Sequence, residues 1–283
     1  MTTTTPSGHR GHRGRQALRA AGAATAALLA LSACSSSGSG SDDSSSSGAD
    51  DSASASAGVS GEVTVLAAAS LKESFTALGA EFEKEHPGTK VTFSFGGSDS
   101  LAASITGGAP ADVFASASPK TMKTVTDAGD ASGTPVTFVR NQLEIATLPG
   151  NPDRISSLKD LTGSGLKVVL CDEEVPCGAA ARTALDAAGL KLTPVSYEQD
   201  VKSALTKVEL KEADAAVVYK TDVHAAGDKV EGVDFPESAD AVNDYPIALL
   251  KNAENAGAAK AFIALVRSEQ GRKVLTGAGF LAP

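Results

Sequence analysis

Residues 63–70 read VTVLAAAS, and residues 93–101 read FSFGGSDSL. In each stretch a hydrophobic run typical of a buried strand leads into small residues and a serine, where a helix is expected to begin. The first backbone N–H groups of a helix have no partner within the helix, so a helix N-terminus is suited to bind an anion. The two serines, Ser70 and Ser98, therefore predict a site in which hydroxyl and amide groups hold a tetrahedral oxyanion, without a metal ion or an arginine.

Strand-like and helix-like segments alternate along residues 61–283, and this order predicts an α/β fold with largely parallel sheets. Apolar spacing and flanking breaker residues predict helices over residues 70–86, 98–106, 119–127, 155–161, 179–188, 198–208, 256–268 and 269–276. Strands are predicted over residues 62–66, 90–95, 112–116, 136–140, 142–147, 166–170, 215–219 and 242–250. Strand–loop–helix modules from the two halves of this pattern can face each other across a cleft.

The first 33 residues have the pattern of an export signal. Arginines precede an apolar run, residues 20–31, which is shorter than the roughly 20 residues that a membrane-spanning helix needs. The run ends in LSAC at residues 31–34, which is similar to a bacterial lipoprotein processing site. We therefore expect a lipoprotein signal peptide over residues 1–33 and lipidation of Cys34. An ordinary signal peptide with an incidental cysteine is the alternative.

The composition separates a tether from a folded body. Residues 35–60 hold thirteen serines and four aspartates but no lysine, arginine or aromatic residue, so we expect residues 34–60 to be a disordered tether. Residues 61–283 are long enough for one large or two medium domains. The chain has a net charge of −9 and no basic patch, which disfavours nucleic-acid binding. An acidic body gives an anionic ligand no long-range steering, so local dipoles must hold it.

Two cysteines remain after Cys34, and they bracket a short turn-like segment. Cys171 and Cys177 are separated by DEEVP. In an exported protein a close pair of this kind indicates a disulfide. The alternatives are a redox pair, which usually has the spacing CxxC, and a metal site, for which His86 and His224 have no suitable spacing.

Seven segments, in their order and spacing, resemble the molybdate receptors of ABC transporters, the ModA family of type II periplasmic binding proteins. They are AAASL at 67–71, GGSDSL at 96–101, GAPADVFASAS at 108–118, EVPCG at 174–178, QDV at 199–201, ADAAVVY at 213–219 and YPIAL at 245–249. The resemblance covers nearly all of residues 61–283. It implies two α/β domains that are joined by two crossover strands and close on the ligand like a hinged clamp. Domain I would comprise residues 61–138 with 247–283, and domain II residues 139–246.

The resemblance also implies the ligand-binding residues. Ser70 and Ser98 would each give a hydroxyl and a backbone N–H group at a helix start. Cys177 and Val201 would each give a backbone N–H group, and Tyr219 its phenol hydroxyl. No side chain would bind a metal cation directly, because molybdenum would be bound as molybdate.

The sequence departs from the family pattern at two positions. Asp99 lies where serines are common, and a carboxylate aimed at the ligand would repel it, so we expect Asp99 to point outward and cap the following helix. Cys177 lies where alanine is common, and a disulfide there would hold the turn rigid. Lys220, Asp222 and His224 are expected to be solvated surface residues.

A tetrahedral dianion such as molybdate has four acceptor oxygens and no proton to donate at neutral pH, so it needs donors only. The resemblance implies a receptor that takes molybdate or tungstate, needs no cofactor, and delivers the anion to a membrane permease with its ATPase. We expect a lipid-anchored monomer on the outer face of the cell membrane. A receptor for sulfate or another small oxyanion is the alternative in the same class.

Enzyme hypotheses fit the sequence less well. A hydrolase with Ser98 as nucleophile would need the G-x-S-x-G pattern, which residues 96–100 lack, and histidine is scarce after the signal. A thiol oxidoreductase would need closer cysteines than Cys171 and Cys177. The sequence also has no P-loop, so it predicts no nucleotide hydrolysis. We therefore expect no catalytic activity.

Overall fold

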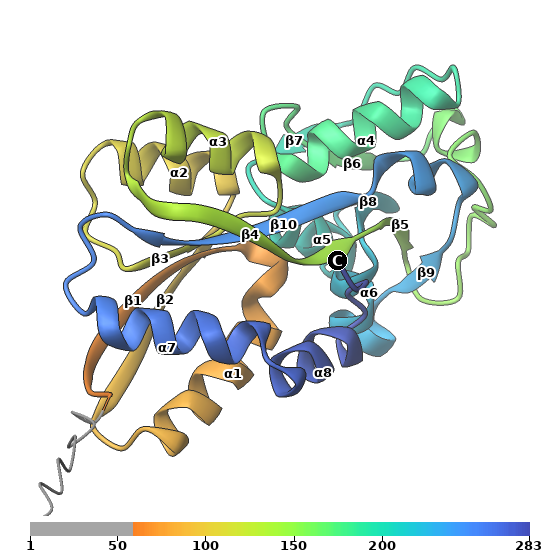
Figure 1. Ribbon diagram of the computed structural model, residues 1–283. Coiled ribbons are helices and arrows are strands. Elements are labelled where there is room, and N and C mark those ends of the chain that lie inside the picture. Colours follow the sequence, from red (N-terminus) through yellow and green to blue (C-terminus); the bar gives the residue numbers. More distant parts are fainter. Residues whose placement is uncertain (1–58) are drawn as a thin grey trace, which may run out of the picture. The chain divides into compact units, whose positions relative to one another are not determined.

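The computed structural model describes residues 59–283 (Figure 1). The predictions of a signal peptide over residues 1–33, of lipidation at Cys34 and of nearly all of the tether lie outside these residues. In the described part, two five-stranded sheets are covered by helices, which confirms the predicted α/β class. No helix within residues 59–283 combines the length and the apolar character that crossing a membrane requires.

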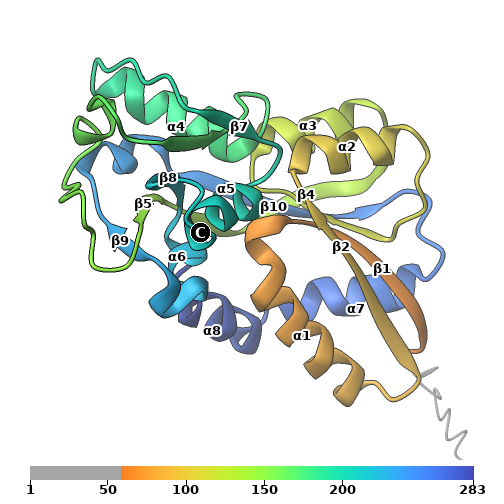
Figure 2. The same ribbon diagram turned by 180° about the vertical axis from the view of Figure 1, so that it is seen from behind.

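The first sheet has the strand order β2-β1-β3-β10-β4. Its strands are β1 (Gly61–Ala68), β2 (Thr89–Gly96), β3 (Val113–Ala115), β4 (Ala131–Asn141) and β10 (Asn243–Leu250). One face is covered by α1 (Lys72–Glu85), α7 (Ala256–Arg267) and α8 (Glu269–Gly277). The other face is covered by α2 (Ser98–Thr106) and α3 (Pro119–Asp127), as Figures 1 and 2 show from opposite sides.

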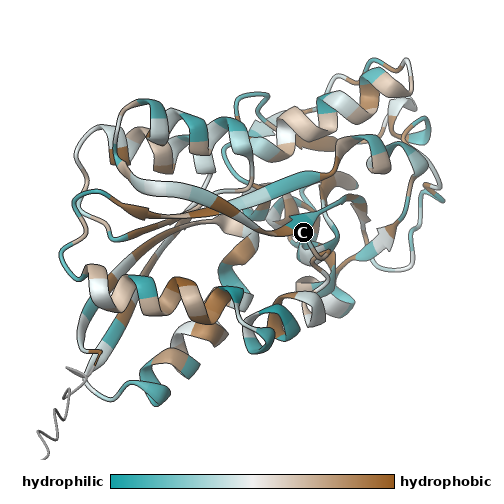
Figure 3. Cartoon of the chain, viewed as in Figure 1, coloured by the Kyte–Doolittle hydropathy of each residue, from teal (hydrophilic) through white to brown (hydrophobic). Residues whose placement is uncertain are grey.

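Aromatic packing holds α1 and α7 on the first sheet. Phe75 and Phe82 recur at helical spacing on α1 and are fully buried. Both rings meet Phe262 of α7 edge-on, with centroids 5.9 Å and 5.6 Å apart. Figure 3 shows the same pattern, with hydrophobic residues on the strands and on the inner sides of these helices.

The second sheet has the strand order β7-β6-β8-β5-β9. Its strands are β5 (Leu143–Thr147), β6 (Val168–Cys171), β7 (Ser196–Glu198), β8 (Ala215–Tyr219) and β9 (Glu231–Val233). The helix α4 (Pro176–Ala187) lies on one side of the sheet, and α5 (Val201–Glu209) and α6 (Lys220–Ala226) lie on the other (Figure 2). All five residues of β8 are buried, as expected for a strand with both faces covered.

The chain crosses between the sheets twice. β4 leads through Gln142 directly into β5, and the chain returns to the first sheet as β10 after the 3-10 segment Pro236–Ala241. Because β4 leaves the first sheet and β10 returns to it, the two strands run antiparallel, with Asn141 opposite Asn243. Each sheet contains two parallel and two antiparallel strand pairs. Both sheets are therefore more mixed than the largely parallel sheets that the sequence predicted.

Local polar contacts overturn one predicted helix. Residues 155–161 form no α-helix, and only a 3-10 turn at Asp160–Thr162 is present. The Asp160 carboxylate accepts hydrogen bonds from the backbone N–H of Ser156 and from the hydroxyls of Ser156 and Ser157. These side-chain bonds compete with the backbone bonds of a helix, and they lower the pKa of Asp160. The helix predicted from residue 198 also begins later, at Val201, because residues 196–198 pair as β7.

Candidate ligand-binding site

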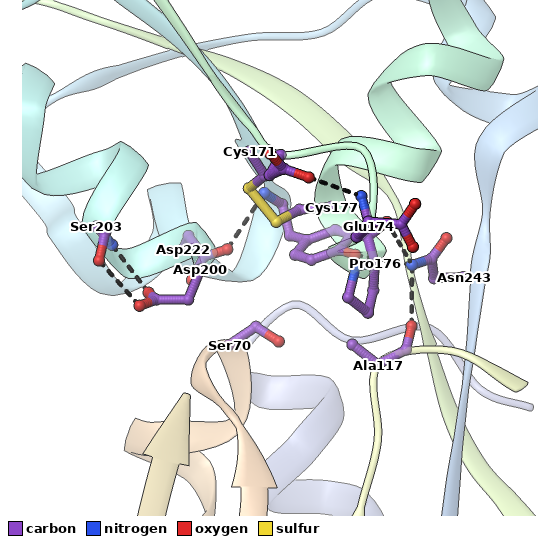
Figure 4. Close-up of a disulfide and its surroundings, with 12 residues drawn as sticks. Ser70, Ala117, Cys171, Glu174, Pro176, Cys177, Asp200, Ser203, Asp222 and Asn243 are labelled. Atoms are coloured by element: carbon purple, nitrogen blue, oxygen red, sulfur yellow. Dashed lines mark hydrogen bonds between the residues drawn. A yellow bond between two sulfur atoms is a disulfide. The ribbon is translucent and has the colours of Figure 1, made fainter. Parts of the chain in front are cut away.

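The structure brings all five predicted ligand-binding residues to one small cavity between the two sheets. Ser70 and Ser98 come from the first half of the described chain, and Cys177, Val201 and Tyr219 from the second. Figure 4 shows Ser70 facing the turn that carries Pro176 and Cys177. Both halves of the molecule therefore contribute to one site.

Ser70 lies in the 3-10 turn Ala69–Leu71, which joins β1 to α1. Its side chain is buried, and its Oγ lies 2.9 Å from the hydroxyl oxygen of Tyr245. The serine is not a side-chain cap of the helix that follows. Its hydroxyl is therefore bound to a tyrosine on β10 rather than to its own helix.

Ser98 is the first residue of α2, and Gly97 is the N-cap. The Ser98 Oγ accepts a hydrogen bond from the backbone N–H of Ala117 at 3.0 Å, and the residue is 1% exposed. A Cβ atom at Gly97 would lie 2.4 Å from the backbone oxygen of Gln199, which belongs to the opposite half. Only a residue without a side chain lets the two halves approach this closely.

Cys177 and Val201 occupy the first turns of two helices. α4 begins at Pro176, which has no backbone N–H group that would need an acceptor at this helix start. α5 begins at Val201, directly after the N-cap Asp200. The N–H groups of a first turn have no carbonyl partner inside the helix, and they carry the positive end of the helix dipole. Each residue can therefore offer a backbone donor to an anion.

A disulfide joins Cys171 at the end of β6 to Cys177 in the first turn of α4 (Figure 4). Both cysteines are buried. The turn between them is tight, because a Cβ atom at Gly178 would lie 1.9 Å from the backbone oxygen of Asp172. The disulfide and Gly178 together fix the start of α4 against the strand.

Tyr219 ends β8 and is 1% exposed. Its hydroxyl oxygen accepts a hydrogen bond from Nδ2 of Asn243 at 2.7 Å. Burial raises the pKa of Tyr219 well above its ordinary value. The phenol therefore keeps its proton at any physiological pH and can donate it.

No lysine or arginine lines this cavity among the described residues, and Asp200 is its one charged lining residue. The Asp200 carboxylate accepts from the backbone N–H and the hydroxyl of Ser203, both at 2.9 Å, as an N-cap does. These bonds hold the carboxylate at its own helix terminus. Polarity in the cavity thus comes from hydroxyl and N–H groups.

The expectation that Asp222 is a solvated surface residue was wrong. Asp222 is fully buried, and its Oδ2 accepts a hydrogen bond from the backbone N–H of Tyr219 at 3.2 Å. Its Oδ1 forms an ion pair with Lys202 Nζ at 3.2 Å, without the geometry of a hydrogen bond. Burial raises the pKa of Asp222 to about 6, although Lys202 opposes the shift. Burial of Asp222 was not expected, because the helix that carries it, α6, was not predicted.

The expectation for Asp99 was also wrong, because Asp99 caps no helix. The N-cap of α2 is Gly97, and Asp99 Oδ2 accepts only from the Ser100 hydroxyl at 3.2 Å. Its Oδ1 is buried without a hydrogen-bond partner in the described part of the chain, next to Gly97. A buried carboxylate oxygen without a partner is costly for the folded state.

Sequence reasoning missed three residues of the hydrogen-bond network around the predicted donors. Tyr245 bonds to Ser70, Asn243 bonds to Tyr219, and Asn141 bonds to Tyr245 at 3.3 Å. Tyr245 stands in a segment that the sequence singled out. Asn141 and Asn243 stand at the ends of their strands, and an amide in such a position does not reveal its partner on another strand.

Comparisons with known proteins show which family the chain belongs to. The family model of bacterial extracellular solute-binding proteins matches residues 63–281. The chain is 45% identical over 221 residues to the molybdate-binding protein ModA of Mycobacterium tuberculosis H37Rv, which covers 78% of this chain and 85% of that protein. It is 33% identical over 234 residues to ModA of Escherichia coli K12, with 78% and 89% covered.

A solved structure shows the same fold. The periplasmic molybdate-binding protein of Azotobacter vinelandii superposes with a TM-score of 0.69 at 22% identity, over 78% of this chain and 99% of that chain. At this identity the likeness concerns the fold alone. The family model matches almost all of the described residues, both sequence relatives are more than 30% identical over most of their length, and the chain therefore belongs to the bacterial extracellular solute-binding proteins.

Proposed function

We propose that this protein is the receptor of an ABC transporter that captures molybdate, and equally tungstate, between its two halves. The halves would be domain I (residues 61–138 with 247–283) and domain II (residues 139–246), which close on the anion as a hinged clamp. The closed receptor then delivers the ligand to a membrane permease with its ATPase. Molybdate is the cargo in this proposal and not a cofactor.

The observation that carries the proposal is the convergence of donors from both halves on one small cavity. Ser70, Ser98, Cys177, Val201 and Tyr219 line it, and each has a hydroxyl or a helix-start N–H group that could donate to an anion. A tetrahedral dianion has only acceptor oxygens, so a cavity of donors is complementary to it. The similarity to ModA proteins, named for molybdate binding, points to the same ligand.

The remaining parts of the proposal concern location and assembly. We infer export through the signal at residues 1–33 and anchoring through lipid on Cys34, with residues 34–60 as a tether. The receptor acts as a monomer and catalyses no reaction. Mass spectrometry of the protein purified from membranes tests the anchor, since lipidation would add the mass of acyl chains to a chain beginning at Cys34.

Thermal unfolding with different oxyanions tests the ligand. A ligand at about a thousand times its Kd stabilises the folded state by roughly 4 kcal/mol. For a protein of this size that raises Tm by on the order of 10 °C. We expect this rise with molybdate and with tungstate, and little change with sulfate or phosphate at equal concentration.

Other outcomes would change the proposal in different ways. A rise with sulfate alone would keep the receptor class and replace the ligand. No rise with any of the four anions would contradict the assignment of the cavity as an oxyanion site.

A further inference from the structure

Asn243 stands where the chain crosses from the second sheet back to the first. It is the first residue of β10, and it lies opposite Asn141, the last residue of β4, which is the other crossing strand. Hinges between domains are usually a few residues at the ends of such elements. A side chain at this position can therefore contact both halves.

The side-chain amide of Asn243 reaches three oxygen atoms. Its Nδ2 lies 2.9 Å from the carbonyl oxygen of Ala117, 3.4 Å from that of Pro176 and 2.7 Å from the Tyr219 hydroxyl oxygen. Figure 4 shows the amide between Ala117 and Pro176. Carbonyl oxygens can only accept, so the atom that faces them is the nitrogen. Because Ala117 follows β3 of the first sheet, whereas Pro176 and Tyr219 belong to α4 and β8, the amide donates to both halves.

Each of these three contacts is tied to a predicted ligand-binding residue. The backbone N–H of Ala117 donates to the Ser98 hydroxyl oxygen at 3.0 Å. Pro176 directly precedes Cys177 in the first turn of α4, and Tyr219 is itself a predicted donor. The single amide is therefore connected to three of the five predicted ligand-binding residues, and these come from both halves.

Asn243 lies on the outer side of the cavity wall. It lines a separate groove, together with Lys120 of α3 and Glu174 in the turn before α4. The Lys120 ammonium and the Glu174 carboxylate lie 3.6 Å apart, but their side chains are 72% and 80% exposed, so this ion pair contributes little. Asn243 is thus placed to hold the two halves together on this side of the cavity without touching an anion.

The Tyr219 hydroxyl has two protein partners. Its oxygen accepts from Asn243, and the hydroxyl also shares a hydrogen bond with that of Tyr245. The Tyr219 proton can point toward Tyr245 or into the cavity while the Asn243 N–H still donates to the oxygen. The link that Asn243 makes between the halves is therefore the same in either orientation of the phenol proton.

We propose that Asn243 is a positioning residue that couples closure of the two halves to assembly of the anion site. The inference rests on the proposed function as an oxyanion receptor. In the closed form the amide bonds to Ala117 in the first half and to Pro176 and Tyr219 in the second, which sets the segments carrying the donors in register. When the halves separate, one amide cannot follow both sides, so these bonds stabilise only the closed form.

Removal of the amide is the first test. Asn243→Ala should raise the Kd for molybdate by about fivefold or more, the effect of losing one or two hydrogen bonds, as titration calorimetry would measure. Asn255→Ala is the matched control. The Asn255 Nδ2 also donates to a backbone carbonyl, that of Glu62 at 2.7 Å, but both residues belong to the half built on the first sheet, so Kd should not change.

The isosteric variant Asn243→Asp separates a donor from a side chain that only fills space. An ionised carboxylate would face two carbonyl oxygens with no proton to donate, so Kd should rise more than in Asn243→Ala at about pH 8. A protonated carboxyl group can donate, so the ratio of variant to wild-type Kd should fall as the pH is lowered to about 5.5. The nearby titratable groups, Lys120, Glu174, Tyr219 and Asp240, are common to both proteins, and the ratio removes their titration and that of the anion.

A double-mutant cycle decides whether Asn243 joins the halves or only orients the phenol. In a Tyr219→Phe background the bonds to the carbonyl oxygens of Ala117 and Pro176 remain. Asn243→Ala should therefore still raise Kd by about twofold or more in that background. A residue that acted only through the Tyr219 hydroxyl would have no effect there.

The outcomes separate the inference from the function on which it rests. A raised Kd in Asn243→Ala, a pH-dependent ratio for Asn243→Asp and a remaining effect in the Tyr219→Phe background support the inference. Wild-type Kd in Asn243→Ala, or no effect in the Tyr219→Phe background, overturns the inference and leaves a receptor that binds molybdate. A wild type that binds no oxyanion overturns the proposed function as well. If Asn243→Asp does not fold, Asn243→Ala and the cycle decide.

Discussion

The ammonium group of Lys202 lies 3.0 Å from the carboxylate of Glu73, and this ion pair joins the two halves of the molecule beside the proposed ligand cavity. Glu73 belongs to α1 on the first sheet, and Lys202 belongs to α5 on the second. The same ammonium group reaches the buried Asp222 at 3.2 Å. The pair exists only while the halves are close together, so it favours the closed form.

Glu73→Gln should therefore weaken molybdate binding modestly. The Glu73 side chain is 49% exposed, and partly exposed ion pairs contribute only about 0.2–1 kcal/mol, which corresponds to at most about a fivefold change in Kd. Titration calorimetry at low and high salt checks this, because added salt should reduce the difference. Glu254→Gln, at an exposed carboxylate with no ion pair in the described residues, is the control. Equal affinities of wild type and Glu73→Gln at low salt would contradict the role of the pair.

Gly97→Ala should hold the halves apart. The added methyl group would lie 2.4 Å from the Gln199 oxygen, although the backbone at Gly97 is one that alanine adopts readily. We expect molybdate affinity to fall by about tenfold or more, with little change in the Tm of the ligand-free protein. Gly257→Ala adds the same methyl group in open space and should leave the molybdate affinity unchanged. A Gly97→Ala protein with wild-type affinity would show that this contact is not needed for binding.

Ser98→Ala should remove one donor from the cavity. A hydrogen bond to a charged group contributes about 1.5–3 kcal/mol, so Kd should rise by about tenfold or more. The domain should remain folded, because only the Ala117 N–H loses a partner. Ser104→Ala, at an exposed position of the same helix, is the matched control. Unchanged molybdate affinity in Ser98→Ala would remove this residue from the site.

Removing the disulfide should affect both stability and binding. Replacing Cys171 and Cys177 with alanine frees a short loop, and the loop-entropy relation gives a loss of about 2 kcal/mol. Because Cys177 lies in the first turn of α4, molybdate affinity should fall as well. Urea unfolding and calorimetry measure the two effects, and reduction of the wild type should reproduce them. A stable variant with unchanged Kd would mean that the turn is fixed without the disulfide.

Asp222 should make stability depend on pH in the mildly acidic range. Its pKa is about 6 in the folded protein and near 3.8 when unfolded, so the folded state binds the proton more tightly. The free energy of unfolding contributed by this group therefore falls as pH rises from about 4 to about 6, by on the order of 2 kcal/mol. Asp222→Asn should lack this contribution. Parallel curves of unfolding free energy against pH for the two proteins would contradict the assignment.

Much of the fold followed from local sequence. The helix over residues 98–106, the helix over residues 119–127 and the strand over residues 215–219 have the bounds that periodicity and breakers predicted. The predicted helix over residues 155–161 failed because Asp160 bonds to two serine residues, a competition that a hydrophobic pattern does not reveal. β7 and β9 have three residues each, too few for a period of two to be recognised.

The sequence by itself determined the α/β class and the small residues and serines at the ends of strands, because these depend on contacts between residues near each other along the chain. It could not determine which hydroxyl meets which donor. Ser70 meets Tyr245, and Tyr219 meets Asn243, only because β10 returns between the two halves and lies beside β4. Burial of Asp222 likewise depends on how α5 and α6 pack. Hydrogen-bond direction and pKa depend on such distant neighbours, so only the tertiary structure decided them.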